Sequence, residues 1–350
     1  MRRTSRAIAW TVLGLAAATL GCYPRYRVRH QPTVPTEPVN AEALNSEADD
    51  MNAAAPPRLA ETFPLVFSTN RFAAEGNRLA AFRIDPSFEV HWGSFRISAQ
   101  PISFHASGGR MRLEPDRPQY GPVVVPAVRP SAAAWDDVVD WKDPVRLVFT
   151  VATAAAGLDL YVSEPFTFTD LERPDAAPIA SEPLTALNTN GDESYLAFGP
   201  GGTAVFVADG DLVSVRGAES WETLLAAKPL ARTALAPLNS PGRETAVSIL
   251  GDRLLFVSDR PGGAGGLDVY LSRLEGDAWG PPSRVVRACS PADEMRPVLV
   301  AYGGTGVRRD GDRRVVEAIA DVDNLLLLFS SNRPGGKGGY DFYYVGLPRD

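Results

Sequence analysis

The stretch that decides the fold occurs twice in this chain. Residues 255–273 read LFVSDRPGGAGGLDVYLSR, and residues 328–346 read LFSSNRPGGKGGYDFYYVG. Each copy is an apolar run, a Gly-rich turn and a second apolar run, which is the pattern of two strands joined by a tight connection. A strand, turn and strand unit that recurs along a chain predicts a repeat architecture.

Weaker copies extend the pattern upstream. Residues 157–163 align with residues 266–272, and a second signature, an acidic residue after a polar turn, recurs at Glu193, Glu244 and Glu294. The three glutamates lie about 50 residues apart, which is the length of one four-stranded propeller blade with generous loops. The sequence therefore predicts an all-β fold, a β-propeller of four-stranded blades.

The number of blades follows from landmarks on the second strand of each unit. These landmarks are Phe67, Phe149, Phe206, Phe256 and Phe329. The gap between the first two is long enough to contain another unit, and residues 101–121 look like a worn copy of one. We expect six blades, with five as the alternative. The last unit ends after its third strand, so we expect a segment near residues 55–62 to close the ring as the missing strand.

The Gly-rich segments have the chemistry of turns. Asp accepts backbone N–H bonds, Pro fixes φ, and Gly supplies a positive φ. We assign structural turn roles to Asp159, Asp211, Asp268, Asp341, Gly262, Gly263, Gly335 and Gly336, and we expect a positive φ at Gly266. Residues 262–268 also resemble, superficially, the Gly-rich nonapeptide of calcium β-rolls. We expect no cofactor, and Ca²⁺ bound between blades is the alternative.

These repeats resemble a known family. Residues 256–263 with 267–270, their C-terminal equivalent, and residues 188–202 are similar to the TolB-like, WD-repeat-like propeller repeats found in bacterial envelope lipoproteins. The resemblance is strong over about residues 185–350 and weak over the residues before them. It implies a propeller in the cell envelope, but such repeats specify a fold far better than a function.

The N-terminus supports that location. A basic segment and a short apolar segment lead to Gly21-Cys22, which is similar to a lipoprotein processing box. We therefore expect residues 1–21 to be a signal peptide, Cys22 to be lipidated, residues 22–58 to form a disordered Pro/Ala-rich tether, and residues 59–350 to form the propeller domain. Tyr23 after the cysteine suggests, by analogy with Gram-negative sorting, an outer-membrane protein facing the periplasm or the cell surface.

Residues for metal or covalent chemistry are scarce. The three histidines are His30, His91 and His105. None flanks a carboxylate motif with ligand spacing, so no metal site is expected. Cys289 has no partner for a disulfide if Cys22 is acylated, and we interpret it as a small packed residue. The repeated glutamates share one phase of the repeat, so they are expected around the ring as a structural device and not as a converging acid/base pair.

Function is argued by exclusion. The formal net charge of −7 argues against nucleic acid as a partner. Within the last unit, an insertion at Tyr302 to Asn324 carries Arg308, Arg309, Arg313 and Arg314, which could dock an acidic partner. We expect a lipid-anchored propeller that serves as a non-catalytic scaffold for an envelope protein or a cell-wall polymer. The alternative is a propeller hydrolase or lyase that acts on envelope glycans or peptides.

Overall fold

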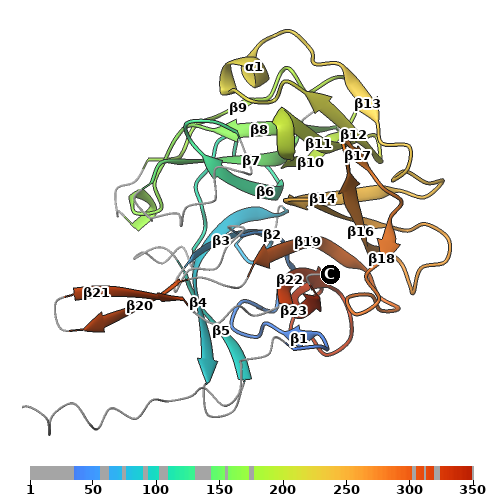
Figure 1. The fold of residues 1–350 in the computed structure, drawn as a ribbon. Helices are drawn as coiled ribbons and strands as arrows, with labels where there is room; N and C mark the ends of the chain where they lie inside the picture. Colours follow the sequence, from blue (N-terminus) through green and yellow to red (C-terminus); the bar gives the residue numbers. More distant parts are fainter. Residues whose placement is uncertain are drawn as a thin grey trace, which may run out of the picture.

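The computed structural model is a ring of small antiparallel sheets (Figure 1). It describes residues 35–348, apart from 56–62, 73–75, 90–93, 102–108, 131–142, 154–156, 173–176, 302–304, 311–312 and 319–323. The only α-helix in the described residues is the short α1 (Trp221–Leu225). The all-β prediction is confirmed.

Three blades follow one another along the first part of the chain. The first consists of β2 (Asp50–Ala54), β3 (Phe63–Thr69), β4 (Arg78–Glu89) and β5 (Ser94–Pro101). The second consists of β6 (Gln119–Pro126), β7 (Val145–Ala152), β8 (Leu158–Ser163) and β9 (Ser181–Pro183). The third consists of β10 (Glu193–Phe198), β11 (Thr203–Ala208), β12 (Asp211–Arg216) and β13 (Arg232–Ala234). Each runs outward from its first strand.

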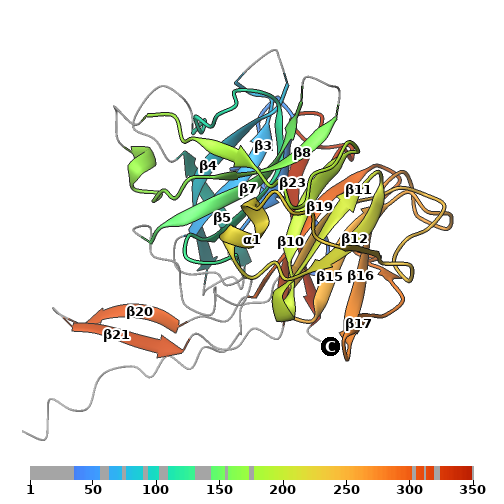
Figure 2. The same cartoon turned by 90° about the horizontal axis from the view of Figure 1, so that it is seen from above.

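Two further blades complete the ring. The fourth consists of β14 (Glu244–Leu250), β15 (Arg253–Ser258), β16 (Asp268–Glu275) and the short β17 (Ala278–Trp279) and β18 (Ser283–Arg284). The fifth consists of β19 (Glu294–Ala301), β22 (Asn324–Ser331), β23 (Asp341–Pro348) and β1 (Val39–Asn40). Between β19 and β22, the hairpin of β20 (Thr305–Asp310) and β21 (Arg313–Ala318) extends away from the ring in both views (Figures 1 and 2).

The ring therefore has five blades, which confirms the propeller and the alternative of five blades in place of six. Residues 101–121, interpreted as a worn sixth unit, include the last residue of β5 and the first residues of β6. Among the described residues, no further sheet lies between the first two blades. All five landmark phenylalanines do lie on the second strand of a blade, and each is fully buried.

The ring is closed by an earlier segment than expected. Val39 pairs with Tyr344 and Asn40 with Tyr343, so β1 is the outer strand of the fifth blade. Leu44, which is 1% exposed, packs behind it in the core between the fifth and first blades. Residues 39–54, which the sequence analysis assigned to a disordered tether, thus form two strands and bury apolar side chains. The segment at 55–62 instead joins β2 to β3.

Apolar side chains fill the junctions between neighbouring blades. Five buried clusters correspond to the five junctions of the ring; Phe256, for example, packs with Val205 and Val207 of the preceding blade. Both faces of a blade are covered, which explains why apolar and polar residues alternate only imperfectly along its strands. No helix among the described residues has the length and apolar character required to cross a membrane.

Candidate functional site

The first residue of every inner strand occupies the same place in its blade. These residues are Asp50, Gln119, Glu193, Glu244 and Glu294. All five side chains are buried, with 0 to 1% of the residue exposed. They lie around the ring axis, at the end of the propeller where the inner strands begin. We call this end the amino face. The Gly-rich loops 259–267 and 332–340 lie at this face too, because they follow the second strands.

The carboxylates at these positions are held by a repeated set of partners. Glu294 accepts hydrogen bonds from Ser290 N (3.1 Å) and Ser290 Oγ (2.6 Å), and Arg333 Nη2 lies 2.9 Å from its Oε1. Glu244 has the same arrangement with Ser240 and Arg260. Each arginine also stacks on the landmark phenylalanine of its blade. Burial raises the pKa of Glu294, while Ser290 and Arg333 oppose the rise.

In two other blades the buried carboxylate is also paired with an arginine, but the residues differ. Glu193 is paired with Arg232, which comes from the outer strand β13 instead of the loop after the second strand. Asp50 is paired with Arg71. We call these four charge-paired groups the lock carboxylates. Because each already has a cation and hydroxyl or amide donors, none is available as a catalytic acid or nucleophile. The structural role expected for the three glutamates agrees with this geometry.

The inner strands share a second feature, a β-bulge just after the lock position. The ladder register shifts there in all five blades. The first residue of each bulge has a positive φ; these residues, which we call the axial cluster, are Asn52 (58°), Gly121 (53°), Tyr195 (53°), Ala246 (56°) and Arg296 (39°). A non-Gly residue in this region costs roughly 1 kcal/mol or more. This cluster cannot be predicted from the repeat, because its members share a position but not a residue type.

The axial cluster brings distant blades together. Arg296 in the fifth blade donates from Nη2 to the carbonyl oxygen of Pro122 in the second blade (3.0 Å). Its guanidinium carbon lies 5.6 Å from the centroid of the Tyr195 ring in the third blade. A Cβ on Gly121 would lie 2.7 Å from Tyr195 Cε1. The side chains of Tyr195 and Arg296 therefore occupy the axis, and glycine leaves room for them.

Polar atoms at the axis lack protein partners. Neither amide atom of Asn52 has a hydrogen-bond partner, and the same holds for Nε and Nη1 of Arg296, among the residues the structure describes. Asn52 is fully buried, Arg296 is 2% exposed, and Tyr195 is partly exposed. Burial lowers the pKa of Arg296 to about 10 and raises the pKa of Tyr195. The charge of Arg296 opposes the rise at Tyr195, and the charge of Tyr195 opposes the fall at Arg296.

Two aspartates and a tyrosine lie beside this cluster on the amino face. The Tyr340 amide donates to Asp49 Oδ1 (3.0 Å), and the Tyr340 hydroxyl donates to Asp293 Oδ2 (3.3 Å). Burial raises the pKa of Tyr340 to about 12, and the negative charges of Asp293, Asp49 and Tyr195 add to the rise. Tyr340 thus connects the axial cluster with two carboxylates that have no arginine partner among the described ion pairs.

The Gly-rich turns show why their residues recur. Asp268 Oδ2 accepts the amide of Ala264 (2.5 Å), and Asp341 Oδ2 accepts those of Lys337 (2.6 Å) and Gly338 (3.1 Å). The glycines before them divide into two kinds. Gly262 and Gly335 have positive φ values of 90° and 97°, while Gly263 and Gly336 leave space for the aspartate side chains.

The other predicted turn residues behave differently. Asp211 follows a two-residue turn of Asp209 and Gly210, which is too short for the same bonds. The turn before Asp159 lies partly outside the described residues. Gly266, for which we expected a positive φ, is not among the glycines with one. A Cβ there would instead collide with Asp293 Oδ1, so close approach is what requires glycine.

Several predicted residues lie away from the amino face. Arg308, Arg309, Arg313 and Arg314 belong to the β20–β21 hairpin. This hairpin follows the end of an inner strand, so it starts from the opposite end of the ring. The proposed docking role of these arginines stays a prediction. Cys22 and the three histidines lie outside the described residues.

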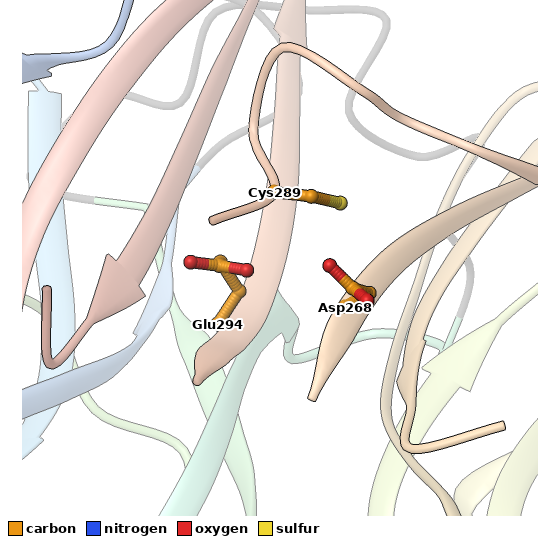
Figure 3. Close-up of side chains that lie close together, drawn as sticks. All are labelled: Asp268, Cys289 and Glu294. Carbon is orange, nitrogen blue, oxygen red and sulfur yellow. The ribbon is translucent and has the colours of Figure 1, made fainter. Parts of the chain in front are cut away.

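One group of possible metal ligands occurs in the described part of the chain. Asp268, Cys289 and Glu294 each offer one ligand atom, and these atoms lie within 4.8 Å of one another (Figure 3). Burial raises the pKa of the Cys289 thiol, and Asp268 adds to the rise, which disfavours the thiolate that metals bind. Glu294 is already paired with Arg333. These contacts favour a structural junction between the fourth and fifth blades.

Comparison with known proteins gives a fold and no family. No protein family model matches the chain, and no curated protein matches its sequence. Among solved structures, it is similar to an alpha-L-arabinofuranosidase from Podospora anserina in complex with cellotriose, with 8% identity and a TM-score of 0.47, over 91% of this chain and 99% of the other.

Two more solved structures give similar values. An endo-arabinase from Bacteroides thetaiotaomicron has 11% identity and a TM-score of 0.46, over 92% of this chain and 99% of the other. A protein of unknown function from Dyadobacter fermentans has 8% identity and a TM-score of 0.45, over 90% and 98%. At these identities the likeness concerns the fold, a five-bladed propeller.

These findings correct the expected function. We expected a non-catalytic scaffold, but the arabinofuranosidase and the endo-arabinase of similar fold are glycan hydrolases. The repeated glutamates are locks, but they are not the only carboxylates of the amino face.

Proposed function

We propose that this propeller binds a glycan at the amino face of its ring and hydrolyses it. The observation that carries the proposal is the arrangement of Asp49 and Asp293 on either side of Tyr340, next to the axial cluster. Glycoside hydrolysis requires two carboxyl groups at one site, one to protonate the leaving oxygen and one to act as base or nucleophile. Neither aspartate has an arginine partner among the described ion pairs, and each accepts a hydrogen bond from Tyr340.

The surrounding side chains suit a sugar. Tyrosine rings offer a flat apolar surface with a hydroxyl at one end, and Tyr120, Tyr195 and Tyr340 are all partly exposed. Asn52 and Arg296 supply unpartnered polar atoms close by. A mostly apolar surface with a few convergent polar groups is the usual character of a small-molecule site. The hydrolases of similar fold agree with this proposal but do not establish it.

The proposed roles are specific. The Asp293 carboxylate, which accepts the Tyr340 hydroxyl, is placed to exchange a proton with a leaving oxygen through that hydroxyl or directly. The Asp49 carboxylate, fixed by the Tyr340 amide, is the candidate base or nucleophile. Both aspartates also hold loops, because Asp293 Oδ1 accepts the Leu267 amide (2.9 Å). Their positions are therefore fixed before a substrate binds.

The test is hydrolysis of neutral and acidic plant and bacterial oligosaccharides, followed by chromatography of the products. Asp49→Asn and Asp293→Asn should each lower the rate at least 100-fold. The matched control is Asp192→Asn, because Asp192 Oδ1 accepts the Leu158 amide (2.8 Å) in the same way but contacts no tyrosine. Equal losses in all three variants, or cleavage of no glycan, would overturn the proposal.

A cell-envelope location is a separate proposal that rests on the N-terminal sequence. The basic and short apolar segments before Gly21-Cys22 support a lipid anchor on Cys22, and the TolB-like wording of the repeats supports an outer-membrane protein facing the periplasm or the surface. Cys22→Ser should abolish acyl labelling and release the chain from membranes, whereas Cys289→Ser should not. Membrane retention of the Cys22 variant would contradict the anchor.

A further inference from the structure

We infer that the axial cluster binds a carboxylate group, so that the preferred glycan is an acidic one that carries a uronic acid. The inference rests on the proposed function, because it names the substrate class of the same face. Its basis is the guanidinium of Arg296, which is buried at the axis and has free N–H groups.

Arg296 differs from the other arginines that face the interior of the ring. Arg71, Arg232, Arg260 and Arg333 are each paired with a lock carboxylate. Arg296 has no ion pair with any carboxylate of the described residues, and its one hydrogen bond goes to the carbonyl oxygen of Pro122. A buried charge without a counterion is strongly unfavourable. An anionic ligand would remove that penalty.

The neighbours of Arg296 complete a site for an anion. Asn52 is fully buried, and its amide lies close enough to the Tyr195 hydroxyl to lower the pKa of this tyrosine. The Tyr195 hydroxyl remains a donor, because burial raises the pKa of this tyrosine. A guanidinium with free N–H groups can donate charge-assisted hydrogen bonds to a carboxylate.

The backbone also indicates a selected position. Equivalent bulge positions in the second and fourth blades hold Gly121 and Ala246, which give the axis no polar group. In the fifth blade the same strained conformation, with a φ of 39°, carries the long cationic side chain of Arg296. Strain kept at such a position is typical of binding and catalytic sites. The partly exposed Tyr195 contacts this guanidinium with its ring, and its charge affects Tyr340 at the amino face.

The experiment compares sugars that differ only in the carboxylate. Isothermal titration calorimetry with D-galacturonic acid and D-galactose should show at least tenfold tighter binding of the acid by the full chain. Arg296→Gln should remove that difference by weakening the binding of galacturonic acid at least tenfold. Sodium acetate and inorganic phosphate are the free-anion controls. Equal binding of acid and neutral sugar, or an acid preference that survives in Arg296→Gln, would overturn the inference.

If Arg296→Gln does not fold, Asn52→Asp tests the same inference. The new aspartate would place a carboxylate of the protein itself at the axis as a counterion for Arg296, so this variant should have a higher melting temperature and no preference for galacturonic acid. An unchanged preference in this variant would overturn the inference, and so would acetate or phosphate that binds as tightly as the sugar acid. Hydrolysis of neutral glycans without acid preference would refute the inference alone. Arg296-dependent acid binding without hydrolysis of any glycan would refute the proposed function alone.

Discussion

Arg296 Nη2 and the carbonyl oxygen of Pro122 lie 3.0 Å apart, although they belong to blades that are not neighbours in the ring. In a five-bladed ring the inner strands are close enough for one side chain to cross the axis. The bulge at each inner strand directs one residue there, so the identity of five residues decides whether the centre is apolar, polar or charged. The chemistry of the axis therefore varies independently of the repeat that builds the fold.

Gly121→Ala should destabilise the protein by about 3 kcal/mol. The new Cβ would meet the Tyr195 ring as well as adopt a positive φ, and overpacking costs about 1–3 kcal/mol beyond the strain. Urea denaturation measures the loss. Gly262→Ala is the control, because Gly262 also has a positive φ but has no atom within 4 Å of its added Cβ. We expect about 1 kcal/mol there, and equal losses would show that strain alone matters at Gly121.

Removing the cation of a lock should be costly. Arg333→Met keeps the apolar stem over Phe329 but leaves the buried Glu294 without its counterion, so we expect a loss of about 3 kcal/mol at neutral pH. The loss should shrink as the pH falls, because burial raises the pKa of Glu294 and protonation removes the buried charge. The control is Asp252→Asn, which removes an exposed ion pair with Arg253 and should change stability by less than 1 kcal/mol.

Much of the fold follows from the sequence because the repeat carries it. A phenylalanine recurs on the second strand of every blade, and Glu193, Glu244 and Glu294 begin three inner strands about 50 residues apart, because these blades need the same buried ring and the same lock. Asp50 was missed because a shorter acid replaces glutamate there and because it lies in a Pro/Ala-rich segment. The sequence favoured six blades over the observed five because the connections of the first two blades are long, and length alone does not distinguish a loop from a sheet.

The candidate site could not be predicted in the same way. Asn52, Tyr195 and Arg296 have nothing in common as residue types, and their convergence depends on bulges that only the strand register reveals. Asp49 and Asp293 directly precede lock carboxylates, so in sequence they look like part of the same acidic turn. Only the geometry separates a carboxylate paired with arginine from one beside a tyrosine.

Tyr340 should lose its proton at a higher pH than an ordinary tyrosine. Burial raises its pKa to about 12 and Asp293 adds to the rise, so the folded state prefers the neutral phenol. The stability that this preference contributes is present below pH 10 and is lost as the pH rises through 12. The difference in 295 nm absorbance between the parent chain and Tyr340→Phe, read by rapid pH jump before unfolding, should have a midpoint near 12. In an Asp293→Asn background the midpoint should be lower, and an unchanged midpoint would contradict the contact.

Cys289→Asn should stabilise the junction between the fourth and fifth blades. At the equivalent position of three other junctions, an asparagine amide exchanges two hydrogen bonds with the backbone of one residue on the preceding blade: Asn45 with Phe342, Asn188 with Leu160, and Asn239 with Leu212.

Cys289 makes only a 3.6 Å contact from Sγ to the carbonyl oxygen of Val269, the corresponding residue. An asparagine there would add an acceptor for the backbone amide and a stronger donor, which together contribute about 1 kcal/mol. Urea denaturation should show this gain, and the reciprocal Asn239→Cys should lose a similar amount. If Cys289→Asn is instead destabilising by more than 1 kcal/mol while Asn239→Cys is neutral, the thiol beside Asp268 and Glu294 has a role that the repeat does not explain.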